Sequence, residues 1–230
     1  MGLRRVGLEE SDVELGDPEL EARALRAARA FLATLPAVSP GGIRRCSLHW
    51  SATPHGWARE RAARGLSLPY NVVVDRNATG DWILVSGMHP VRNARRLTLE
   101  MQEGVEYCAS IRGRNSHAVS ASIAAMDDAS PSAFGAAPID AASVELLCAS
   151  AAALCARYGI DARAAEACYT HAEAALWDGY FGTGDDERWD MAVLEPGGDD
   201  VAALGERAVQ TGNLLRARIA AYVDVVRVPG

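Results

Sequence analysis

Residues 46–53, CSLHWSAT, are the stretch around which the chain is organised, an apolar run that delivers His49 and continues into small polar residues. The pattern predicts a short β-strand with an imidazole at its end. Far downstream, YTHAE repeats the arrangement around His171, and RWD supplies the carboxylate of Asp190. Two imidazoles and one carboxylate, brought together by a fold, make a zinc site with its fourth position open to water.

Length and composition are those of an ordinary globular protein. A chain of 230 residues can bury a full core, and its 49% hydrophobic and 23% charged residues are usual for that class. The formal net charge of −7 argues against nucleic acid as a partner, because that role usually needs a basic face. All 23 positive residues are arginine, so catalysis through a lysine Schiff base is excluded.

The cysteines and the N-terminus indicate a cytoplasmic origin. Five cysteines are an odd number and form no CxxC pair, which indicates a reducing compartment rather than a disulfide scaffold. Acidic residues follow the N-terminal arginines, so no signal peptide is expected. No apolar segment reaches the length needed to cross a membrane. We therefore expect synthesis in the cytoplasm and no membrane insertion.

Hydrophobic periodicity and chain breakers predict strands mixed with helices. This order indicates an α/β or α+β fold, in which a central mixed β-sheet is flanked by helices. Residues 1–42 are expected to form an N-terminal helical extension, and residues 43–230 the main domain with a C-terminal helix. Predicted helices span residues 17–37, 57–65, 97–107 and 140–158, with a last helix capped by Thr211; predicted strands span residues 43–50, 70–75, 82–86, 118–126 and 167–171.

Four segments follow one another in an order known from one family. They are the His49 segment with its SAT, residues 69–75 (PYNVVVD), the predicted helix 140–158 followed by HAE, and the RWD that ends in Asp190. Together they resemble the zinc-dependent N-acetylmuramoyl-L-alanine amidases of type 2, which include phage endolysins, muropeptide-recycling amidases and peptidoglycan recognition proteins. The resemblance covers residues 43–195 and implies the fold of that family.

The resemblance assigns His49, His171 and Asp190 as ligands of Zn²⁺. Two neutral imidazoles and one carboxylate leave the ion one net positive charge, which can acidify a water molecule. Asp190 could instead form an ion pair with Arg188 or cap a turn. His55 and His89 lie beside prolines in polar stretches and are interpreted as structural. Three other aspartates compete for the third ligand position: Asp178, Asp185 and Asp186.

The resemblance also implies roles for side chains around the metal. Tyr70 is either a core aromatic or a residue whose hydroxyl reaches the developing oxyanion. Arg188 would hydrogen-bond the oxyanion, although its permanently charged guanidinium is a poor proton donor. Glu173 is expected to orient a ligand. His117 lies near the expected cleft and, with Asn71, is a candidate substrate contact.

The chain departs from the family pattern in three places. The NxSIG strand of the family is represented by residues 115–120 (NSHAVS). A glutamate that some members place on this strand corresponds to Ser122, so no general acid is identified. Insertions are expected at residues 87–110 and 179–186.

These features predict hydrolysis of the amide between N-acetylmuramic acid and L-alanine in peptidoglycan. The SAT motif and Tyr70 favour a phage or prophage endolysin that reaches the wall after release, while the acidic charge gives no attraction to an anionic wall. A cytoplasmic amidase that recycles muropeptides is the alternative. Two further interpretations remain: a zinc-free protein of the same fold that binds peptidoglycan, and a metallopeptidase that cuts the stem peptide.

Overall fold

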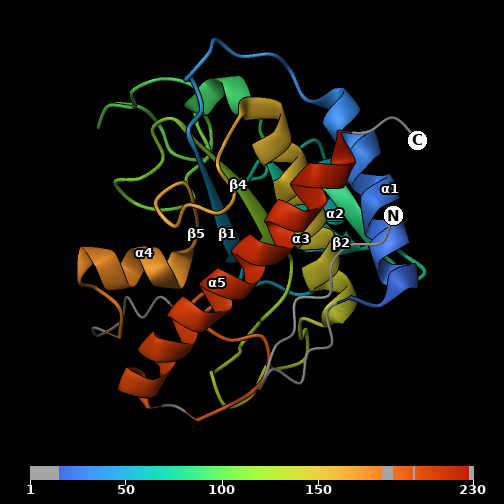
Figure 1. Ribbon diagram of the computed structural model, residues 1–230, viewed down its shortest axis with the longest axis vertical. Helices are drawn as coiled ribbons and strands as arrows, with labels where there is room; N and C mark the ends of the chain where they lie inside the picture. Colours follow the sequence, from blue (N-terminus) through green and yellow to red (C-terminus); the bar gives the residue numbers. More distant parts are fainter. Residues whose placement is uncertain (1–15, 183–188, 199, 228–230) are drawn as a thin grey trace.

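The computed structural model describes residues 16–182, 189–198 and 200–227. Within these residues, five strands form one mixed sheet, which confirms the predicted α/β class (Figure 1). The strands are β1 (Arg45–Trp50), β2 (Val72–Arg76), β3 (Trp82–Ser86), β4 (Ala118–Ile123) and β5 (Cys168–Thr170).

The strands lie in the order β3-β2-β4-β1-β5. Strand β1 is parallel to both of its neighbours, β4 and β5, and β2 is parallel to β4. The edge strand β3 runs antiparallel to β2, as the predicted hairpin requires. In the turn between them, the Asn77 side-chain oxygen accepts hydrogen bonds from the backbone N–H groups of Thr79 and Asp81. The carboxyl ends of the four parallel strands therefore meet at one edge of the sheet.

Helices cover both faces of this sheet, and the alternation of side chains along β2 shows how. Val72 and Val74 belong to the main hydrophobic core, beside the residues of α3, whereas Val73 packs with Ala58 of α2 on the other face. In Figure 1, the long α5 crosses in front of α3, and α1 lies at its side. The helices are α1 (Pro18–Thr34), α2 (Trp57–Ala63), α3 (Ala141–Tyr158), α4 (His171–Asp178) and α5 (Val201–Val226), with a 3₁₀ turn η1 (Pro90–Asn93).

The central helix α3 begins and ends where its sequence indicates. The Asp140 side chain accepts a hydrogen bond from the Ser143 N–H, and the Asp140 N–H donates one to the Ser143 hydroxyl, which is a capping box; Gly159 ends the helix with a φ of 69°. By length and composition α3 could cross a membrane, contrary to the expectation from the sequence, but most of it is buried inside the protein, as in the core helix of a globular domain. The sheet and helices α1 and α5 pack against it.

A buried ion pair connects α3 to α5 and α1. Glu145 and Arg218 are almost fully buried, and their closest N–O distance is 2.7 Å. The Tyr222 hydroxyl also donates to Glu145 at 2.8 Å, and Arg218 reaches Glu21 of α1 at 2.6 Å. Ala28 and the rest of the buried face of α1 belong to the main core. The N-terminal helix 18–34 therefore shares one core with the rest of the domain.

Three predicted elements differ from the structure. Residues 97–107 form turns instead of a helix, and side chains accept hydrogen bonds from their backbone: Leu97 N–H donates to the Ser116 hydroxyl, and Gln102 N–H donates to the Glu106 carboxylate. His171 begins a helix instead of closing a strand. The last helix begins ten residues before Thr211, since the Asp200 side chain caps it at Ala203.

The buried carboxylate of Asp75 replaces a missing helix cap. Helix α2 begins after Gly56, which has no capping side chain, and Asp75 at the end of β2 accepts hydrogen bonds from the N–H groups of Gly56, Arg59 and Arg76. In an Asp75→Asn variant, an NH₂ group would face one of these donors. We expect a loss of roughly 1–3 kcal/mol in the free energy of unfolding by urea. The exposed Glu100→Gln control should unfold like the parent, and equal stability of Asp75→Asn would contradict this account.

Candidate metal centre

The two histidines are adjacent because their strands are neighbours in the sheet. His49 is the next-to-last residue of β1, and His171 follows the last residue of β5. Leu48 is paired with Thr170 across these strands, so the residue after each lies at the same carboxyl edge. This edge is where parallel sheets place their ligand sites.

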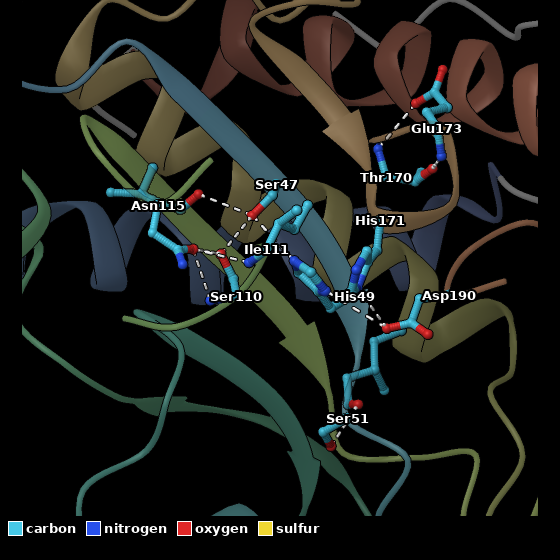
Figure 2. A network of polar contacts seen from close by, with 12 residues as sticks. Ser47, His49, Ser51, Ser110, Ile111, Asn115, Thr170, His171, Glu173 and Asp190 are labelled. Atoms are coloured by element: carbon cyan, nitrogen blue, oxygen red, sulfur yellow. Dashed lines mark hydrogen bonds and ion pairs between the residues drawn. The ribbon is translucent and has the colours of Figure 1, made fainter. Parts of the chain in front are cut away.

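Helix α4 fixes His171 at its first position. The Thr170 hydroxyl accepts a hydrogen bond from the backbone N–H of Glu173 at 3.1 Å, and the Glu173 carboxylate accepts one from the Thr170 N–H at 3.0 Å. This reciprocal pair is a capping box, for which a Thr followed by a Glu three positions later is the sequence signal. His171 therefore projects from a helix start whose backbone is held on both sides (Figure 2).

Asp190 reaches the histidines from a loop attached to the same helix. Its backbone carbonyl accepts a hydrogen bond from Ala172 at 3.0 Å. The next residue, Met191, is fully buried with a φ of 63°, a left-handed conformation that is uncommon for a residue with a side chain. Before it, the Trp189 ring packs edge-on against Trp50 at a centroid distance of 4.8 Å. Contacts on both sides thus determine where the Asp190 side chain points.

The three side chains have the spacing of ligands around one ion. Their ligand atoms all lie within 4.8 Å of one another. Asp190 Oδ2 is 3.2 Å from His171 Nδ1 and 3.7 Å from His49 Nδ1, and both rings point toward it in Figure 2. Ligands held at ~2.0–2.2 Å in a tetrahedron are roughly 3.3–3.6 Å apart. The cluster could therefore hold a metal ion with little rearrangement.

The cluster is closed on the protein side and open at the carboxylate. His49 is 1% exposed and His171 8%, whereas the Asp190 side chain is 21% exposed. Among the described residues of the cluster, the Asp190 side chain is therefore the one most accessible to solvent.

Electrostatics keep the cluster in the protonation state that binds metal. Burial, together with the charge of His171, lowers the pKa of His49 to about 4, and Asp190 offsets only part of this effect. Burial acts to raise the pKa of Asp190, but the neighbouring His171 and His49 rings hold it well below its usual range. At neutral pH His49 is therefore a neutral imidazole and Asp190 a carboxylate, as ligation requires.

The lowered pKa of His49 makes the stability of the metal-free protein depend on pH. Below pH 6.5 the unfolded chain binds a proton on this ring, but the folded protein does so only near pH 4. The free energy of unfolding should therefore fall as the pH drops from about 6.5 to 4, by up to about 3 kcal/mol. Urea unfolding of chelator-treated protein across this range measures the effect. A His49→Gln variant should lose this part of the slope, and identical slopes would contradict the assignment.

The aromatic predicted to act beside the metal lies against the cluster. The Tyr70 ring is half-buried, and its centroid is 5.5 Å from that of His49. Its backbone carbonyl accepts a hydrogen bond from Met88, and a Cβ on Gly87 would lie 2.0 Å from that oxygen. The close approach allowed by Gly87 thus helps to place Tyr70 beside the cluster.

Glu173 contacts the backbone before His171 and a buried arginine. Two oxygens of its carboxylate accept hydrogen bonds from Arg216 of α5 at 2.7 and 2.8 Å, and Arg216 also donates to the Cys168 carbonyl. A Cβ on Gly212 would lie 2.2 Å from the Glu173 carboxyl carbon, so α5 can approach only because this residue is glycine. Arg216 was not predicted from the sequence; the available signal was that Arg216 and Arg218 both lie among the apolar residues of the last helix.

The structure does not bring the two candidate substrate contacts to the cluster. Asn71 is 3% exposed, and its amide is used by the backbone, since it donates to the Met88 carbonyl and accepts from the Ser120 N–H. His117 precedes the first residue of β4, whereas His49 is paired with Ser122 near the other end of that strand. His117 therefore lies toward the amino edge of the sheet, away from the metal ligands.

The remaining candidates have other contacts or lie outside the described residues. Asp178 forms a two-pronged ion pair with Arg114 at 2.6 and 2.7 Å, away from the third ligand position. His55 contacts the Pro138 carbonyl, and His89 caps η1, in line with structural roles. Three residues lie outside the described part of the chain: Asp185, Asp186 and Arg188.

Comparison with known proteins gives no match for this chain: no family model, no curated protein and no solved structure matches it.

Proposed function

We propose that the chain is a zinc-dependent N-acetylmuramoyl-L-alanine amidase that hydrolyses peptidoglycan. The observation that carries the proposal is the meeting of His49, His171 and Asp190 within 4.8 Å, at one edge of the sheet. These are the three residues that the resemblance assigns as ligands, and His49 is more than a hundred residues from the other two in the sequence. Two imidazole nitrogens and one carboxylate, with an open side, are a donor set that suits Zn²⁺.

The metal ligands and Tyr70 would have different roles in the proposed reaction. A zinc ion, when bound, would polarise the scissile carbonyl and lower the pKa of water. The two buried imidazoles and Asp190 hold it, and their burial excludes solvent from all but the Asp190 side. Tyr70, whose ring lies against His49, would direct its hydroxyl toward the carbonyl oxygen of a substrate and stabilise the charge that develops there.

The substrate class follows from the same proposal. We infer an enzyme of the phage or prophage endolysin type, which acts on intact wall. Two features of the sequence favour this type: the SAT segment at residues 51–53, and Tyr70. Its substrate is then polymeric peptidoglycan. The alternative is a recycling amidase that acts on soluble anhydro-muropeptides, and comparing turnover of the two substrates by the purified protein separates these cases.

Product analysis tests the proposed reaction directly. Purified sacculi are digested with the zinc-loaded protein, with and without chelator, and the products are identified by mass spectrometry. We expect new L-alanine amino groups, no new reducing sugar ends, and no release in the presence of chelator. Cleavage inside the stem peptide would instead mark a metallopeptidase, and binding to sacculi without any release would mark a peptidoglycan-binding protein.

A further inference from the structure

The imidazole of His49 has a second polar contact, on the side away from Asp190. Ser47 and His49 are two residues apart on β1, so their side chains share one face of the sheet. The Ser47 hydroxyl is buried and lies 3.2 Å from His49 Nε2 (Figure 2). A neutral imidazole carries its proton on one nitrogen only, so this contact bears on which nitrogen keeps a lone pair for a metal.

Ser47 belongs to a network of polar contacts that runs from His49 through Ser47 and Ser110 to Asn115. Asn115 is the last residue of this network. Its side-chain oxygen accepts hydrogen bonds from the backbone N–H groups of Ser110 at 3.0 Å and Ile111 at 2.9 Å. Two N–H donors fix the orientation of the amide, because its NH₂ group could not face them. The Ser110 hydroxyl lies 3.1 Å from the same oxygen and donates its hydrogen there.

The direction of the hydrogen bonds then follows along the network. With its hydrogen on Asn115, Ser110 offers a lone pair to Ser47, whose hydroxyl lies 3.2 Å away. The Ser47 hydrogen then has two acceptors, the Ser110 hydroxyl and the Val119 carbonyl at 3.5 Å. With its hydrogen on either of them, Ser47 has a lone pair left for the N–H at His49 Nε2. The other nitrogen, Nδ1, is 3.7 Å from Asp190, beyond hydrogen-bond distance, and keeps its lone pair.

We propose that Ser47, Ser110 and Asn115 are positioning residues that hold His49 in the Nε2–H tautomer and aim its Nδ1 lone pair at the metal position. This inference rests on the proposed metal site, but not on the reaction. Ser47 belongs to β1, whereas Ser110 and Asn115 lie in the irregular segment before β4. The network would fix the tautomer and orientation of the His49 ring in the metal-free protein, so that metal binding requires less rearrangement.

Nitrogen-15 NMR of the histidine rings in chelator-treated protein at pH 7.5 measures the tautomer, and titration with Zn²⁺ measures the affinity. In the parent protein the His49 signals should show a proton on Nε2. Ser47→Ala should give a mixture of tautomers and bind Zn²⁺ about 10–100-fold more weakly. Ser47→Thr, which keeps a hydroxyl, should restore both properties, and Ser110→Ala should show a smaller change of the same kind.

Ser51→Ala is the matched control, because Ser51 lies on the same segment and its hydroxyl contacts Thr53 and the Ile123 carbonyl instead of His49. It should keep the parent tautomer and the parent affinity. A proton on Nδ1 of His49 in the parent, or a Ser47→Ala variant with unchanged tautomer and affinity, would overturn the inference. Neither measurement requires peptidoglycan hydrolysis, so both still test this inference if the proposed reaction is wrong.

Discussion

Alanine in place of His49, His171 or Asp190 is expected to lower the rate of wall hydrolysis by roughly three orders of magnitude or more. Metal chemistry supplies several kcal/mol of transition-state stabilisation, and each 1.36 kcal/mol corresponds to about a tenfold change in rate. Each variant should also lose bound zinc, since two remaining ligands hold the ion weakly. The release of L-alanine amino groups and the zinc content are measured on the same preparations.

The exposed His89 provides the control for these variants. Its ring accepts a hydrogen bond from the backbone N–H of Val91 at the start of η1 and takes no part in the metal cluster. His89→Ala should keep the parent activity and the parent zinc content. If an alanine variant of any of the three ligands kept both, the assignment of that residue would be wrong.

Arg216→Met is expected to cause the largest loss of stability, about 3–5 kcal/mol. The side chains of Arg216 and Glu173 are 6% and 2% exposed, and removing the cation leaves the Glu173 carboxylate buried without its partner. Because Glu173 also caps α4, the start of the helix that carries His171 should become less rigid. The free energy of unfolding in urea measures the first effect, and the zinc affinity measures the second.

Two comparisons make this prediction specific. Arg163 pairs with Asp224 on the surface, where both side chains are about two-thirds exposed, so Arg163→Met should cost less than about 1 kcal/mol. The double variant Arg216→Met with Glu173→Gln leaves no unpaired charge and should recover part of the lost stability. A loss for Arg216→Met no larger than that for Arg163→Met would refute the role of the buried pair.

Local sequence signals were sufficient for most of the sheet and for the strand that carries His49. The apolar run of β2 predicted an interior strand, and Val72 to Val74 are fully buried. Asp140 and Gly159 marked the two ends of α3 correctly. His49 could be placed at a strand end for the same reason. Each of these features depends on neighbouring residues, which is the information that a single sequence carries best.

The misread segments are those where side chains override the local pattern. Residues 97–107 were predicted to be helical, yet Leu99 is fully exposed, and the Ser116 hydroxyl and the Glu106 carboxylate accept hydrogen bonds from the backbone of this segment. The strand before His171 is only three residues long, and the predicted strand 167–171 includes one residue, His171, of the helix that the Thr170–Glu173 capping box begins. Propensity is a weak guide where such contacts decide.

Other features of the site depend on contacts between distant parts of the chain. Arg216 reaches Glu173 across 43 residues, and Ser47 reaches Ser110 across 63. Neither pair leaves a periodic or spaced pattern in the sequence. The contacts that support the side chains of the candidate metal centre can therefore be identified only from the three-dimensional structure.

The most direct test of the central claim is an anomalous difference map, collected at the zinc absorption edge, from crystals of the zinc-loaded protein. A single strong peak is expected about 2.0–2.2 Å from His49 Nδ1, His171 Nδ1 and an oxygen of Asp190. A map with no peak between these three side chains, at full zinc loading in solution, would contradict the account.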